Sequence, residues 1–264
     1  MLQRIAAAPA TIARPAVSTT DLWKFAGVTL LLVDHYGLFF DEDQDWWRVA
    51  GRIAAPIFFF LIGYARTRQV PASWIVWGLV LTAVDTWTSG EGLGKINLNI
   101  LINFALVRLL LPEVESRVMG RPVRVALLVL AIILLIRPFQ QVLEYGAQGW
   151  LWALFGLAHR LAAESRSRLD AALRDGVAFA TALAYTGKEI IDYEFALAEG
   201  IALAVLVGIV TIALARFRRA DAVWSPPEPI AGFMRFCGRH SLQIYAVTLL
   251  AMQILAYALD LSEE

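Results

Sequence analysis

Apolar residues gather along the chain into nine segments that are separated by short polar stretches. The segments cover approximately residues 22–40, 48–66, 72–88, 97–111, 122–138, 148–163, 174–190, 196–215 and 240–259. Pro112, Pro122 and Pro138 fall at or between segment ends, where a missing backbone N–H does little damage. Apolar runs of this kind are typical of helices that cross a bilayer. We therefore expect an all-α, polytopic membrane bundle with about nine transmembrane helices.

Composition supports this class and narrows the chemistry. The chain is 59% hydrophobic and 17% charged, with a mean hydropathy of +0.61, and a soluble domain could not bury that much apolar surface. The formal net charge is zero, so charge gives no argument for nucleic-acid binding. Cys237 is the single cysteine, which excludes an internal disulfide and a cysteine-based metal site. The three histidines are scattered without metal-ligand spacing, and we expect no metal.

Charge also predicts the orientation. Most of the 23 Lys and Arg residues lie at the segment ends that share one side if the N-terminus is cytoplasmic. The positive-inside rule then predicts an N-in, C-out topology. Residues 1–20 hold no acidic residue and no long apolar core, so we interpret them as a disordered cytoplasmic tail. Residues 21–264 then form one transmembrane domain.

Three ionisable residues lie inside the first two segments. Asp34 and His35 are adjacent in the first segment, and Arg52 lies in the second. His35 and Arg52 are similarly distant from the intervening acidic loop, so an antiparallel hairpin brings them to similar depth. Ionisable groups within a membrane are costly and usually mark a function. The alternative is a structural hydrogen-bonded pair between helices.

Each of these residues has a predicted role and an alternative one. His35 is the candidate general base, because neutral imidazole accepts a proton near neutral pH. Arg52 is the candidate anchor for an acid or an oxyanion, unless it extends to the outer interface. Asp34 either bonds His35 or balances Arg52. Pro56 leaves a backbone carbonyl free one turn earlier, a common feature beside a cavity.

Further polar residues occur in the third and fourth segments. Asp85 lies near the outer end of the third segment, where it could border a substrate cavity or cap a helix at the interface. Asn99 and Asn103 are spaced to share one helix face. We expect these two residues either to line a polar cavity or to form a hydrogen-bonded contact between helices.

Three stretches together resemble the TraX family of bacterial inner-membrane proteins. They are residues 24–37 (KFAGVTLLLVDHYG), residues 47–68 (WRVAGRIAAPIFFFLIGYARTR) and residues 236–245 (FCGRHSLQIY). TraX proteins are similar to a wider superfamily of membrane acyltransferases, whose donor is a cytoplasmic coenzyme A thioester. The activity named for the family is N-terminal acetylation of conjugative pilin.

The resemblance implies a set of roles. In the superfamily a basic residue and a histidine mark the first helix, with the spacing that Lys24 and His35 have here. His35 would be the general base, with Lys24 and Arg52 along the path of donor or substrate. Acetyl-CoA is the expected donor, and an amine or hydroxyl of a protein or glycan is the expected acceptor. Lys24, Arg66 and Arg68 lie at the cytoplasmic ends of the first hairpin, so we expect them to bind the donor's phosphates.

Two other functions remain open. In a proton-coupled transporter, Asp34, His35 and Arg52 would form the proton relay. Transporters usually contain two similar halves, and no internal repeat is visible here. In a non-catalytic membrane assembly partner, the polar residues would only hold helices together. Stabilisation by coenzyme A would distinguish an acyltransferase from both.

Overall fold

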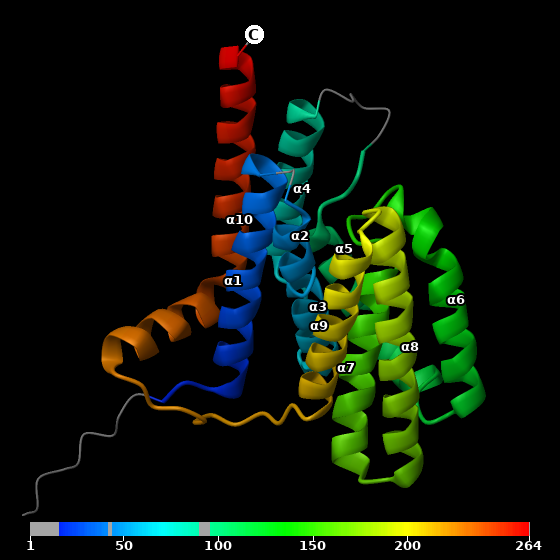
Figure 1. Cartoon of the computed structure of the whole chain (residues 1–264). Coiled ribbons are helices and arrows are strands. Elements are labelled where there is room, and N and C mark those ends of the chain that lie inside the picture. The colour runs from blue at the N-terminus through cyan, green and yellow to red at the C-terminus, as the bar shows by residue number, and fades with distance from the viewer. Residues whose placement is uncertain (1–15, 42–43, 90–95, 264) are drawn as a thin grey trace, which may run out of the picture.

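The computed structural model describes residues 16–41, 44–89 and 96–263, and the regular elements in these ranges are all helices. In chain order they are α1 (Thr19–Phe40), α2 (Asp45–Gly51), α3 (Ala54–Tyr64), α4 (Ala72–Thr88), α5 (Ile100–Arg117), α6 (Pro122–Gln140), α7 (Gln148–Ser165), α8 (Arg168–Asp192), α9 (Leu197–Ala215) and α10 (Glu228–Glu263) (Figure 1). The prediction of an all-α chain is confirmed. Most of the predicted tail, residues 1–15, lies outside the described residues. Within the remainder, Val17 forms a backbone bridge with Trp224 and α1 already begins at Thr19.

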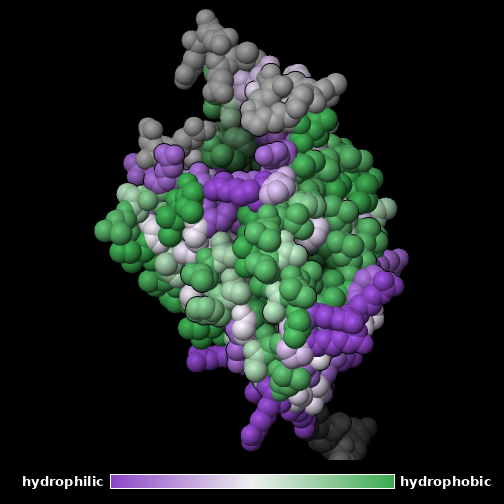
Figure 2. Space-filling view, turned by 90° about the vertical axis from the view of Figure 1, so that its right-hand side faces the viewer, coloured by the Kyte–Doolittle hydropathy of each residue, from purple (hydrophilic) through white to green (hydrophobic). Residues whose placement is uncertain are grey.

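The helix surfaces fit a membrane. Among the described residues, four stretches are long and apolar enough to span one, namely Asp45–Tyr64, Pro122–Gln140, Leu197–Ala215 and Glu228–Leu259. Large apolar side chains on α6 and α9 face outward, including Leu134, which is 68% exposed, and Leu197, which is 80% exposed. Figure 2 shows apolar side chains across the middle of one face, with polar side chains gathered nearer its ends. The protein is therefore a helical membrane protein, and the number of passes and the orientation stay predictions.

The second apolar segment is broken, which the hydropathy pattern did not predict. The chain leaves regular helix at Arg52 and Ile53, between α2 and α3. Pro56 has no N–H to donate to the carbonyl of Arg52, four residues earlier. The Tyr185 hydroxyl of α8 donates to that carbonyl instead, at 2.5 Å. The carbonyl that the sequence predicted to be free is therefore satisfied by another helix.

The last helix also differs from the prediction. α10 begins at Glu228, well before the predicted start at residue 240, and His240 has non-helical backbone angles inside it. Figure 1 shows the part before this kink lying obliquely, while the part after it rises beside α1. The kink therefore separates an oblique first part of α10 from the part that rises beside α1.

Helices α3 and α7 pack closely, backbone against backbone. A Cβ atom at Gly63 would overlap the backbone carbonyl of Ala153, and one at Gly156 would overlap that of Phe60. Small residues let membrane helices approach closely, so that dispersion forces between backbones replace the missing hydrophobic force. The contact fixes α3, which carries part of the cavity wall described below.

We expect Gly63→Ala to destabilise the protein by about 1–3 kcal/mol, because the added methyl group meets rigid backbone. Gly208→Ala is the matched control, since a Cβ at that position of α9 meets nothing within 4 Å. The thermal unfolding midpoints of the two variants in detergent give the measurement. Equal midpoints would show that the α3–α7 contact adapts without cost.

Two connecting segments pair with each other. The N–H of Leu98 donates to the carbonyl of Val142 at 2.8 Å, and the N–H of Glu144 donates to the carbonyl of Leu98 at 2.9 Å. The first segment leads into α5 and the second joins α6 to α7. The Asn99 side chain in turn donates to the Tyr245 hydroxyl of α10 at 2.7 Å. This pairing places Glu144 and Tyr145 against the helices that carry the ionisable residues.

Candidate active site

Asp34 forms a buried ion pair with two arginines of the neighbouring helix. Two of the three side-chain nitrogens of Arg52, Nε and Nη2, donate to the Asp34 carboxylate. The hydrogen bond from Nε is 3.2 Å long. Arg48 Nη1 lies 3.1 Å from the same carboxylate and donates to the Asp34 carbonyl. Gly51 allows this approach, because a Cβ there would overlap Asp34. Of the two alternatives for Asp34, the structure has it balancing Arg52.

The ion pair continues into α8. Arg52 Nη1 donates to the Tyr193 hydroxyl at 2.6 Å and lies 3.7 Å from Glu189. Glu189 also accepts hydrogen bonds from Gln148 and Lys188. Every nitrogen of the Arg52 side chain is thus engaged, and α1, α2 and α8 are tied together through one cluster of charges. Glu189 and Tyr193 were not predicted, although an acid inside an apolar segment is a signal that could have found Glu189.

His35 lies outside this cluster. Its ring is buried and stands 5.8 Å from the ring of Tyr245 and 6.4 Å from that of Phe39. Within the described part of the chain, its Nδ1 atom has no hydrogen-bond partner. A buried imidazole without a structural bond is available to a ligand, which favours the catalytic interpretation of His35 over the structural one.

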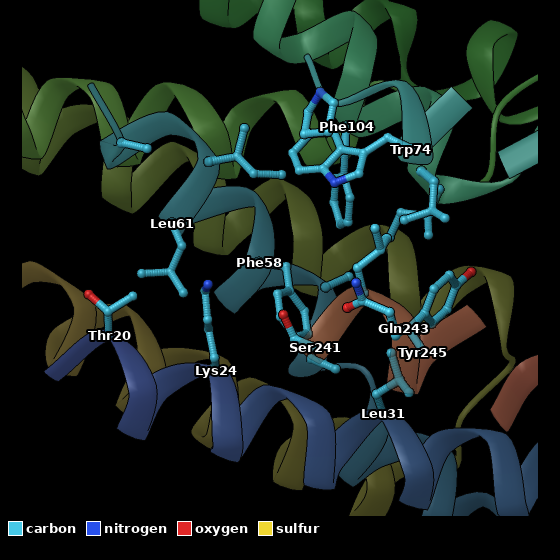
Figure 3. A pocket seen from close by; sticks show the side chains of 18 of the residues that line it. Thr20, Lys24, Leu31, Phe58, Leu61, Trp74, Phe104, Ser241, Gln243 and Tyr245 are labelled. Atoms are coloured by element: carbon cyan, nitrogen blue, oxygen red, sulfur yellow. The ribbon is translucent and has the colours of Figure 1, made fainter. Parts of the chain in front are cut away.

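A cavity of about 610 Å³ reaches His35 from the side where α1 begins. We call it the Lys24 cavity. Lys24, Arg219 and Arg239 line it towards that end, and His35 and Glu144 line its deep end. Figure 3 shows Thr20 and Lys24 extending from α1 on one side, with Trp74 and Phe104 across the cavity from them. Asp21 and Asp221 also line the cavity, so its entrance carries both signs of charge with an excess of basic side chains, and its wall is aromatic in part.

A second cavity of about 410 Å³ includes Arg52 and is called the Arg52 cavity. Asp85 and Asn99 line it, which is one of the two positions that the sequence left open for each of them. Four residues line both cavities, namely Asp34, His35, Glu144 and Tyr145. The predicted meeting of His35 and Arg52 around one cavity is therefore present in the structure. The two cavities converge on the same imidazole.

Asn103 differs from its partner Asn99. It lines neither cavity and is fully buried. Its amide nitrogen donates to the carbonyls of Glu144 and Gly146, each at 2.9 Å, and its oxygen accepts from the Trp150 indole at 2.7 Å. The amide of Asn103 therefore holds the α6–α7 connection and the start of α7 in place. Of its two predicted positions, Asn103 has the hydrogen-bonded contact between segments and not the lining of a cavity.

The predicted donor-binding residues are divided between two places. Lys24 lines its cavity and donates to the carbonyl of Gly238 at 3.1 Å. Arg66 and Arg68 line neither cavity, and they pair with Glu164 at 2.9 Å and Glu115 at 3.0 Å. The end of α3 does reach this cavity, since Tyr64 and Ala65 line it, but the side chains of Arg66 and Arg68 turn to Glu164 and Glu115 instead. The arginines at the Lys24 cavity are Arg108, Arg219 and Arg239.

Glu144 is the main site residue that the sequence did not predict. Its Oε2 accepts from the backbone N–H of Ile100 at 2.8 Å and from the Asn99 amide at 3.0 Å. It belongs to a short polar connection, where an acidic residue is usually solvated and attracts no notice. Only the pairing of the two connecting segments places it opposite His35.

The described residues contain no group of three or more His, Cys, Asp or Glu that could hold a metal ion. Residues 19–228 of the chain match the sequence model of a protein family that is described as TraX protein. No curated protein and no solved structure matches the chain.

Proposed function

The chain belongs to the TraX family, and from this premise we propose that it is an integral membrane acyltransferase. The donor would be a coenzyme A thioester, acetyl-CoA in the first instance, and the acceptor an amine or hydroxyl of a protein or glycan. Acetylation of pilin, the activity linked to the family, is the nearest model for the reaction. The observation that carries the proposal is the convergence of two cavities on His35.

The proposed topology has nine passes with the N-terminus in the cytoplasm of a bacterium and the bundle in its inner membrane. The positive-inside rule supports this orientation. It directs the basic entrance of the Lys24 cavity to the cytoplasm, where coenzyme A thioesters occur. The Arg52 cavity then opens towards the opposite side and is the proposed site of the acceptor.

Within this scheme His35 takes the proton from the acceptor as it attacks the thioester carbonyl. The predicted oxyanion role of Arg52 has less support, because its nitrogens already bond Asp34 and Tyr193. We propose instead that Arg52 holds α1 in position. The Tyr245 hydroxyl accepts from Asn99 and lines the Lys24 cavity beside His35, so its proton is available to stabilise an oxyanion.

The same geometry also suits a proton-coupled transporter. Two cavities that approach one buried ionisable residue from different sides are what alternating access requires. The basic entrance of the Lys24 cavity favours the acyltransferase, because Lys and Arg bind phosphates through charge-assisted hydrogen bonds. Binding of coenzyme A separates the two functions.

We expect coenzyme A to raise the thermal unfolding midpoint of the purified protein in detergent, since a ligand that binds only the folded state stabilises it. Replacing Arg219 and Arg239 by Gln should remove most of this rise and increase the KM for acetyl-CoA more than it lowers kcat. The reason is that both arginines line the cavity far from His35, where they contact the donor and not the reacting atoms.

The matched control is the double replacement of Arg66 and Arg68 by Gln, which removes the same charge from the same end of the molecule outside the cavity. Its midpoint shift with coenzyme A should equal that of the unmodified protein. If this control loses the shift instead, the donor binds at Arg66 and Arg68 as the sequence predicted. No shift with coenzyme A in any of the proteins would contradict the acyltransferase proposal.

A further inference from the structure

The carboxylate of Glu144 has two oxygens in different situations. Oε2 is held by the N–H of Ile100 and by the Asn99 amide. Oε1 accepts no hydrogen bond from the described residues, and the side chain lines both cavities. One oxygen is therefore fixed by the protein, and the other faces the space in which the proposed reaction takes place.

Capping of α5 does not by itself account for this residue. The Asn99 side chain already caps the helix by accepting from the N–H of Leu101 at 3.1 Å. A cap also needs no access to a cavity, whereas Glu144 shares the junction of both cavities with His35. The N-terminus of α5 instead holds one oxygen of the carboxyl group and leaves the second oxygen without a hydrogen bond from the described residues, beside the two cavities.

Acyl transfer from a thioester requires two proton movements. The attacking amine or hydroxyl loses a proton, and the departing sulfur must gain one to leave as a thiol. His35 accounts for the first movement only. Besides His35, Glu144 and Tyr145 are the residues that line both cavities without taking part in the ion pair of Asp34 with Arg48 and Arg52, and of these two Glu144 carries the stronger acid, a carboxyl group.

Resting on the proposed acyltransferase function, we propose that Glu144 is a second catalytic residue, which protonates the leaving thiolate. As the carbon–sulfur bond breaks, the carboxyl proton of Glu144 passes to sulfur and gives the free thiol and a carboxylate. His35, protonated by the acceptor, returns its proton to Glu144 directly or through water. The acyl group ends on the acceptor, both residues regain their starting states, and no further reactant is needed.

The electrostatics of the connection support this role. Burial raises the pKa of Glu144 to about 7, against the lowering effects of the Ile100 hydrogen bond and the positive charge of Arg52. The negative charges of Asp85 and Asp34 act in the same direction as burial. A group with this pKa carries its proton below about pH 7 and loses it above, so it can act as an acid near neutrality.

Glu144→Gln tests the proposal. The amide oxygen can still accept from Ile100, so the fold should persist, but the side chain cannot supply a proton. We expect kcat with acetyl-CoA to fall by about 10²–10³-fold. The fall in rate that the unmodified protein shows as pH rises through the Glu144 pKa should also disappear. Glu199→Gln is the control, because this carboxylate of α9 lines neither cavity and its variant should keep full activity.

A comparison of leaving groups makes the test specific to proton donation. Two small acetyl thioesters are supplied, one with an alkyl thiol and one with an aryl thiol of lower pKa, whose thiolate leaves without protonation. The deficit of Glu144→Gln should be large for the alkyl thioester and nearly absent for the aryl one. Because both are measured on one preparation, a loss of folded protein affects them equally.

An equal deficit for both, or none for either, would overturn the role of Glu144 while leaving the acyltransferase intact. If the unmodified protein transfers no acyl group, the proposed function itself fails.

Discussion

His35→Ala should abolish acyl transfer and leave expression and membrane insertion nearly unchanged. The imidazole lines both cavities and its Nδ1 bonds no other described residue, so its removal breaks no hydrogen bond that holds the bundle. A positioned general base contributes about 10²–10⁴-fold in rate. Turnover with labelled acetyl-CoA measures the loss, and the thermal shift with coenzyme A shows whether the donor still binds.

His240→Ala is the control for this result. His240 lies at the kink of α10, lines neither cavity, and its ring contacts Phe236 at 4.8 Å. We expect its variant to retain turnover. Full turnover in His35→Ala would remove this histidine from the mechanism. Lost turnover together with a lost donor shift would make His35 a binding residue and not a base.

Asp34→Asn should destabilise the protein by about 3–5 kcal/mol, because it leaves the buried guanidinium groups of Arg48 and Arg52 without their main counter-charge. Adding Arg52→Gln in the same protein should recover part of the loss, since one of the uncompensated charges is then gone. The midpoints of unfolding of the single and double variants in detergent give the coupling between the two residues.

An exposed ion pair provides the comparison. Arg137 pairs with Asp192 at 2.7 Å, but its side chain is 62% exposed. Arg137→Gln should therefore cost only about 0–1 kcal/mol. A loss in Asp34→Asn no larger than this would mean that water reaches the buried arginines. A double variant as unstable as the sum of the two single ones would mean that Asp34 and Arg52 are not coupled.

The sequence by itself determined the helical membrane class and the similar distance of His35 and Arg52 from the loop between them, which the structure shows lining one cavity. Both depend on local properties, since the apolar content of a segment decides whether it forms a helix in lipid, and counting from a loop gives the distances of His35 and Arg52. The free carbonyl before Pro56 was equally local, because proline lacks an N–H wherever it occurs. That Asp85 and Asn99 could border a cavity followed from their polarity, because a polar residue in an apolar segment is costly to expose to lipid, but the alternative positions stayed open.

Only the tertiary structure decided which groups meet. Asp34 and His35 are neighbours in sequence and both line the two cavities, yet Asp34 bonds Arg52, whereas Nδ1 of His35 has no hydrogen-bond partner among the described residues. Whether Arg66 or Arg219 stands at the entrance depends on how α3 and the segment after α9 pack. Glu144 joins the site through hydrogen bonds to Leu98 and Ile100, across a long stretch of chain. Hydropathy and spacing describe each segment alone, whereas these contacts arise from the packing of segments that are distant in sequence.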